Sequence, residues 1–98
     1  MSDYRDEIAI VAENREPIPF EEAAVHGTAG KRFVFVSPTM ELCECKFRRY
    51  LNLFPPALLR KIHSRRIILL DDSELIFLTD YLIEHGALRG IGKVVWCI

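Results

Sequence analysis

Three short apolar runs, each too dense to leave a polar face, constrain the fold of this chain most. They are RFVFVS at residues 32–37, RIILL at residues 66–70 and KVVWCI at residues 93–98. A continuous run rich in β-branched and aromatic residues is typical of a strand that is covered on both faces. Longer segments with helical spacing separate the runs, which favours parallel strands joined by crossovers. We therefore expect an α/β fold with a small, mostly parallel sheet of three or four strands and helices packed on it.

The length and composition fit a single compact domain over residues 1–98. Hydrophobic residues make up 50% of the chain and charged residues 28%, which is typical of a globular protein. The organisation of residues 1–30 stays open, because EIAIVAE at residues 7–13 fits a strand by composition and a helix by spacing; we favour a strand. We find no export leader and no apolar stretch of roughly 18 residues that could span a membrane. We expect a cytoplasmic protein without membrane contact.

Helix signals follow the first predicted strand. Ser37 is a good N-cap, and Pro38 after it suits the first helical position. The double proline Pro55-Pro56 forbids continuation of that helix. We expect one helix between these signals and a second, short helical piece from Pro56 to His63.

The first predicted helix contains ELCECKFRRYLNLFPP, residues 41–56, with two cysteines one residue apart. At about 100° per residue, Cys43 falls on the core side and Cys45 on the opposite side, beside Arg48 and Arg49. The expected core stripe contains Met40, Cys43, Phe47, Tyr50, Leu51 and Phe54. Because the two sulfurs point apart and no second pair of ligands exists, we expect no metal site and no cofactor. The three cysteines are expected to be free thiols, and Cys45 is a candidate reactive thiol.

A third helix is expected over residues 72–85, and it is apolar on nearly all sides. Acidic residues open it, and Gly86 suits its C-cap. Its expected core stripe is Leu75, Leu78 and Leu82. A helix of a small protein rarely buries so much of its circumference in its own fold. We therefore expect a contact with another chain, most simply a homodimer, through Ile76, Phe77, Tyr81 and Ile83.

Two regions of the chain are candidate ligand sites. In HGTAGKR, residues 26–32, Lys31 leads into a strand, so the segment is interpreted as a turn and not as a phosphate-binding loop. We expect a short helix beginning near Pro19 before this turn.

The second region is formed by the ends of the predicted strands. In parallel sheets, ligands bind beyond the carboxyl ends of the strands. There the expected topology gathers Ser37, Thr39, Asp71 and Asp72. These residues form a possible ligand crevice, although helix capping explains each of them without a ligand.

Charge is distributed unevenly along the chain. Residues 1–30 carry seven acidic and two basic side chains, whereas residues 46–66 carry seven basic side chains and no acidic one. Six of the basic residues can gather on one side: Arg48, Arg49, Arg60, Lys61, Arg65 and Arg66. Such a surface attracts an acidic protein or the phosphates of a nucleic acid. The neighbouring aromatic residues are expected in the core, where they cannot stack on bases.

These patterns together favour a small non-enzymatic interaction or regulatory module. Its basic residues would bind an acidic partner, and its apolar helix would mediate self-association. Two alternatives remain open: a nucleic-acid-binding regulator that uses the same basic residues, and a small enzyme with its site at the carboxyl ends of the strands. The sequence contains no clear catalytic constellation of nucleophile and base, so we expect no catalytic residue.

Overall fold

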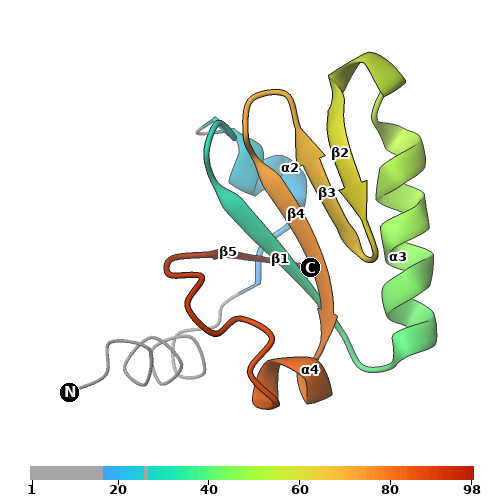
Figure 1. Cartoon of the computed structure of the whole chain (residues 1–98), viewed down its shortest axis with the longest axis vertical. Helices are drawn as coiled ribbons and strands as arrows, with labels where there is room; N and C mark the ends of the chain where they lie inside the picture. The colour runs from blue at the N-terminus through green and yellow to red at the C-terminus, as the bar shows by residue number, and fades with distance from the viewer. Residues whose placement is uncertain (1–16, 26) are drawn as a thin grey trace.

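One five-stranded sheet organises the part of the chain that the computed structural model describes, residues 17–25 and 27–98 (Figure 1). The strands are β1 Arg32–Ser37, β2 Leu59–His63, β3 Arg66–Leu69, β4 Glu74–Thr79 and β5 Val95–Cys97. The α-helices of the described residues are α2 Phe20–Ala24, α3 Met40–Leu53 and α4 Asp80–Glu84, and a 3₁₀ turn, η1, covers Pro56–Leu58. The α/β class with helices packed on a sheet is thus confirmed. The strand predicted at residues 7–13 lies outside the described residues.

The sheet is mixed, with the strand order β2-β3-β4-β1-β5. β1 pairs parallel with β4 and with β5, whereas β3 pairs antiparallel with both β2 and β4. The expectation of a mostly parallel sheet with three or four strands is therefore wrong. The reason lies in the short connections between β2 and β3 and between β3 and β4, since a connection of a few residues can only reverse the chain direction.

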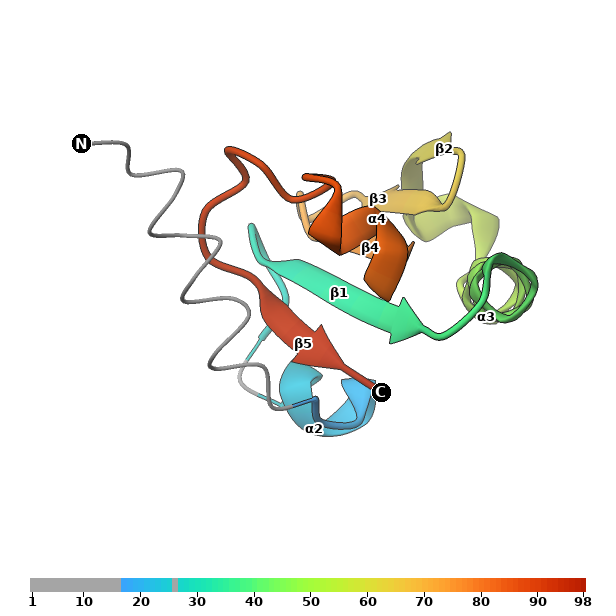
Figure 2. The ribbon, with the colours of Figure 1, turned by 90° about the horizontal axis from the view of Figure 1, so that it is seen from below.

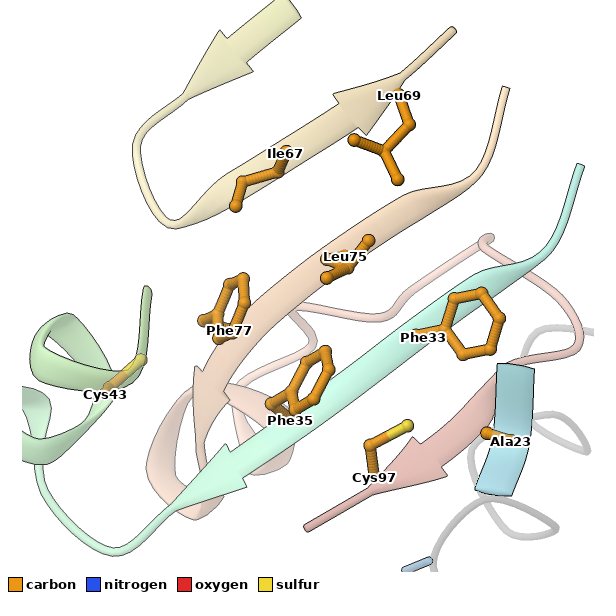
Figure 3. Packing of buried hydrophobic residues seen from close by; sticks show 9 residues of the cluster. All are labelled: Ala23, Phe33, Phe35, Cys43, Ile67, Leu69, Leu75, Phe77 and Cys97. Atoms are coloured by element: carbon orange, nitrogen blue, oxygen red, sulfur yellow. The ribbon is translucent and has the colours of Figure 1, made fainter. Parts of the chain in front are cut away.

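β1 lies between β4 and β5 in the sheet, and its bounds are those predicted from RFVFVS. Successive side chains of a strand point to opposite faces, so Phe33 and Phe35 face α3 while Val34 faces the other side. Figure 3 shows the larger core cluster on the α3 side. Its buried members are Ala23, Phe33, Phe35, Cys43, Ile67, Leu69, Leu75, Phe77 and Cys97.

The chain after β4 covers the opposite face of the sheet only in part. Figure 2 shows α4 and the segment after it on the other side of β1 from α2. The second core cluster joins this segment to β1, β4 and β5 through Val34, Ile76, Leu78, Leu88 and Trp96. No described residue of β2 or β3 belongs to that cluster. The part of this face formed by β2 and β3 therefore carries the polar side chains described below.

α3 confirms most of the predicted helix between the two proline signals. Thr39, and not Ser37, is its N-cap, and the Thr39 hydroxyl accepts a hydrogen bond from the N–H of Leu42 (3.2 Å). The helix ends at Leu53, just before Pro55. Its predicted core stripe is confirmed except at Met40, which is exposed.

The third predicted helix is wrong over most of its length. Residues 74–79 form β4, and only Asp80–Glu84 are helical. Phe77 is 0% exposed and Ile76 is 5% exposed, because β4 lies between β1 and β3 with one core cluster on each face. A segment that is apolar on all sides fits a central strand as well as it fits a buried helix, and here the strand is formed.

The short helical piece predicted from Pro56 to His63 is also mostly wrong. Only η1 is helical, and Leu59–His63 form the edge strand β2, which pairs with β3. Two further local predictions are confirmed: α2 begins at Phe20, directly after Pro19, and residues 27–31 turn the chain into β1.

Burial separates two aromatic residues that the helix prediction placed on one exposed side. Phe77→Ala should lower the free energy of unfolding by about 3–5 kcal/mol, because it leaves a cavity between the strands and α3. Tyr81→Ala should cost less than about 1 kcal/mol, because Tyr81 is 65% exposed. Urea unfolding of both variants measures the difference. Equal losses in the two variants would contradict the burial described here.

Candidate functional site

The four residues of the predicted ligand crevice lie at opposite ends of the sheet. Ser37 ends β1 beside Thr79, its partner on β4, and Thr39 caps α3 just beyond. Asp71 and Asp72 lie in the turn before β4, at the end of the sheet where β1 begins. Because β3 runs antiparallel to β4, the end of β3 and the end of β1 point in opposite directions. The crevice therefore does not form from these four residues.

Asp71 instead holds the β3–β4 turn together. Its Oδ1 accepts hydrogen bonds from the Ser73 N–H (2.9 Å) and the Ser73 hydroxyl (2.5 Å), and its Oδ2 accepts one from the Thr28 hydroxyl (2.5 Å). The hydrogen bonds from Ser73 and Thr28 lower the pKa of the Asp71 carboxyl. Asp72 follows with a φ of 66° and forms an ion pair with Arg60.

The six predicted basic residues fall into three groups. Arg48 and Arg65 both form ion pairs with Glu44, at 3.7 and 3.9 Å. Arg49 lies on α3 and lines a separate pocket at the carboxyl end of β1. Arg60, Lys61 and Arg66 lie on β2 and β3. Arg48 of the helix and Arg65 of the hairpin thus meet at Glu44, whereas the other four basic residues are not part of this contact.

The third group belongs to a surface that we call the basic sheet face. It consists of Arg32, Arg60, Lys61, His63 and Arg66, together with the acidic Asp72 and Glu74. Most of these side chains line a shallow cavity of about 490 Å³. Strand alternation explains their position, because Arg32, Arg66 and Glu74 precede the core residues Phe33, Ile67 and Leu75 and so point to the other face.

Glu74 lies at the centre of the basic sheet face between two guanidinium groups. Arg66 Nε donates to Glu74 Oε2 (2.6 Å), and Arg32 Nε lies 3.5 Å from Glu74 Oε1. Arg32 also donates to the carbonyl of Ile91 (3.1 Å). The Glu74 side chain is only 15% exposed, so the three-residue network fixes the two arginines in place.

Sequence reasoning did not find Arg32, His63 or Glu74. Arg32 and Glu74 are the first residues of strands that lie next to each other, and their pairing across β1 and β4 could be recognised only once the strand order was known. His63 and Lys61 were assigned to a helical piece, whereas the alternation of β2 places both opposite residues of β3.

A second pocket, which we call the carboxyl-end pocket, lies between the end of β1 and α3. It has a volume of about 310 Å³. Its lining residues are Val36, Ser37, Pro38, Leu42, Cys45, Lys46 and Arg49. Ser37 and Arg49, which the sequence assigned to different sites, are here part of the same site, and Lys46 is an addition that the sequence did not single out.

Two of the predicted apolar contact residues are not on the surface. Ile76 and Phe77 are buried in β4, and Ile83 packs partly buried against the second core cluster. Tyr81 is exposed and stacks on His85, with 4.0 Å between the ring centroids. The apolar surface that was expected to bind a second copy is therefore reduced to Tyr81.

The cysteines are free, as expected, and differ in exposure. Cys43 and Cys97 are buried, whereas Cys45 is exposed. Burial raises the pKa of the Cys43 thiol, and burial raises that of Cys97 to about 11. Within residues 17–25 and 27–98 no group of three or more His, Cys, Asp or Glu side chains is arranged to hold a metal ion. In the same residues no helix is long and apolar enough to cross a membrane.

Comparisons with protein-family models, with curated proteins and with solved structures found no match to this chain.

The difference in burial predicts the reactivity of the three thiols. In the native protein only Cys45 should react quickly with a thiol reagent such as dithionitrobenzoate, because the other two are inaccessible and protonated. Cys45→Ser should remove the fast phase, and all three thiols of the unmodified chain should react in denaturant. The measurement is the absorbance of the released thiolate. Fast reaction of the Cys45→Ser variant would contradict the burial of Cys43 and Cys97.

The hydrogen bonds of Asp71 predict a pH-dependent stability. A carboxyl whose pKa is lower in the folded state stabilises that state above its unfolded pKa, and the contribution disappears as the pH falls through the folded value. Asp71→Asn should therefore cost about 0.5–1 kcal/mol at pH 7, a modest value because the carboxylate is largely solvated. The difference should shrink as the pH falls below the ordinary aspartate pKa of about 3.9. Urea unfolding of both proteins across this range tests it; a difference independent of pH would contradict the role of the charge.

Proposed function

We propose that this protein is a binding module that recognises an acidic segment of a partner protein through its basic sheet face. The observation that carries the proposal is the gathering of five basic side chains from β1, β2 and β3 on a part of the sheet left uncovered by the second core cluster. Paired strands present their side chains at a fixed spacing on a rigid sheet.

The charges of the basic sheet face are unevenly neutralised. Glu74 is shared by Arg32 and Arg66, and Asp72 is paired with Arg60. No described residue forms an ion pair with Lys61 or a hydrogen bond with its side chain, and the same is true of His63. The surface thus has four permanent positive charges against two negative ones, and an anionic partner is attracted to the surplus.

The Arg60–Asp72 ion pair can be exchanged for an ion pair between Arg60 and a partner. Its two side chains are 58% and 64% exposed, and exposed ion pairs contribute little to stability, typically less than about 1 kcal/mol. A carboxylate of a partner can therefore replace Asp72 at Arg60 at low cost. Arg32 and Arg66 are held by the less exposed Glu74, and Arg32 lines the cavity.

A protein partner fits this surface better than a nucleic acid. Phosphates that follow the strands would meet Asp72 and Glu74, which line the cavity. No described aromatic side chain lines that cavity apart from the ring of His63, and base stacking is a main source of single-strand binding. Self-association remains a separate proposal with less support, because Ile76 and Phe77 are buried.

The test compares two charge reversals of equal size. A fluorescein-labelled octaglutamate peptide is the probe, and its binding is followed by anisotropy at low salt. Lys61→Glu should weaken binding roughly tenfold, since it converts an attraction into a repulsion at the site. Arg48→Glu is the matched control, because Arg48 is paired with Glu44 on α3, and it should change the affinity less than about twofold.

Two results would contradict the proposal. Equal weakening by the two substitutions would mean that the peptide responds only to net charge. Tighter binding of a single-stranded oligonucleotide than of the peptide, with steep loss on added salt, would favour the nucleic-acid alternative.

A further inference from the structure

The carboxyl-end pocket lies at a topological switch point of the sheet, where the connections that follow two neighbouring strands leave on opposite faces. From β1 the chain passes through α3 on one face, and from β4 it passes through α4 on the other face to reach β5. β4 and β5 lie on either side of β1 and run parallel to it. In α/β sheets, ligands bind beyond the carboxyl ends of the strands at such a position. This pocket is distinct from the basic sheet face, and the two share no described lining residue.

Two basic side chains of α3 line this pocket, and none of its described lining residues is acidic. Leu42, Cys45, Lys46 and Arg49 follow the i, i+3, i+4, i+7 spacing of one helix stripe. Within the described part of the chain, neither Lys46 nor Arg49 forms an ion pair. Arg48, the residue next to Arg49, is paired with Glu44 at 3.7 Å. The stripe facing the pocket thus keeps its cations available for a ligand.

Ser37 supplies a polar group to the lining of the pocket. The residue is only 4% exposed, and it lines the pocket where β1 ends. Its hydroxyl forms no hydrogen bond with any described residue. Because no fully buried polar side-chain atom of the described residues lacks a partner, the Ser37 hydroxyl is accessible, and it can donate to a negatively charged oxygen that enters the pocket.

We propose that the carboxyl-end pocket binds a phosphate monoester carried on a small apolar group. Lys46 and Arg49 match the charge of close to −2 that a phosphate monoester has near neutral pH. The Ser37 hydroxyl would donate to a phosphate oxygen, and α3 begins at the pocket with its positive dipole end. Val36, Pro38 and Leu42 supply an apolar wall for the rest of the molecule. The volume, about 310 Å³, is at the small end of ligand pockets.

Cys45 gives a direct readout, because it lines the pocket and is the exposed thiol, whereas Cys43 and Cys97 are buried. The full-length chain is treated with iodoacetamide in the presence of increasing phenyl phosphate, with chloride keeping the ionic strength constant. Saturable protection is expected, with at least a fivefold fall in the alkylation rate of Cys45. Mass spectrometry identifies the modified cysteine.

Substitutions then assign the protection to the proposed contacts. Arg49→Gln should raise the concentration needed for half-protection at least tenfold, and Ser37→Ala should raise it severalfold. Arg48→Gln is the matched control on the same helix and should leave it unchanged within twofold. Each protein is compared with its own rate without ligand, so a change in intrinsic thiol reactivity does not affect the comparison, and circular dichroism confirms folding.

Four results would overturn the proposal. The first is the absence of saturable protection in the unmodified chain. The second is equal half-protection in the Arg49→Gln and unmodified proteins. The third is equal protection by benzyl alcohol, which would reveal an apolar groove without phosphate recognition. The fourth is protection by oligothymidylate but not by phenyl phosphate, which would assign the cations to a nucleic-acid backbone.

Discussion

The rest of the structure depends on the pairing of β1 with β4 and on the need to cover both faces of this pair. The rings of Phe35 and Phe77 stack across the two strands, with 4.7 Å between their centroids, and Tyr50 of α3 packs on both rings. On the other face Val34, Ile76 and Leu78 require a second cover, which the chain after β4 supplies. Burial of large apolar side chains is the main favourable term in folding, so the strand pair fixes where the helices of the described residues can lie.

The sequence predicted the elements whose signals are local. β1, most of α3, the end of α3 before Pro55 and the position of Cys43 all follow from dense apolar runs, helix spacing and proline, and none of them needs knowledge of a distant partner. β4 could not be separated from a helix in this way, because a strand buried on both faces has no alternation to reveal it. The strand direction was missed for the same reason: once β4 is taken as a helix, the antiparallel position of β3 cannot be deduced.

The candidate sites were less predictable than the fold, because they depend on which strand ends lie together. Ser37 was identified correctly as a residue at a carboxyl end, and Asp71 was assigned to the same end only because β3 was expected to run parallel. The basic residues were read as one group from their closeness in sequence. In the structure, the alternation of side chains on β2 and β3 and the helical spacing of α3 place these basic residues in separate sites. Each site also contains a residue from elsewhere in the chain: Glu74 in the basic sheet face and Ser37 in the carboxyl-end pocket.

β2 is the edge of the sheet, and no described residue pairs with its outer side. An open edge can template the addition of further strands, and proteins that remain in solution protect such edges with charge and with irregular pairing. β2 has both devices: Arg60, Lys61 and His63 are exposed on it, and its register with β3 shifts between Leu59 and Lys61. Antiparallel pairing of two β2 edges would bring the positive charges of Arg60 and Lys61 in the two copies together. The charges proposed here to attract an acidic partner thus also oppose edge-to-edge polymerisation of the sheet.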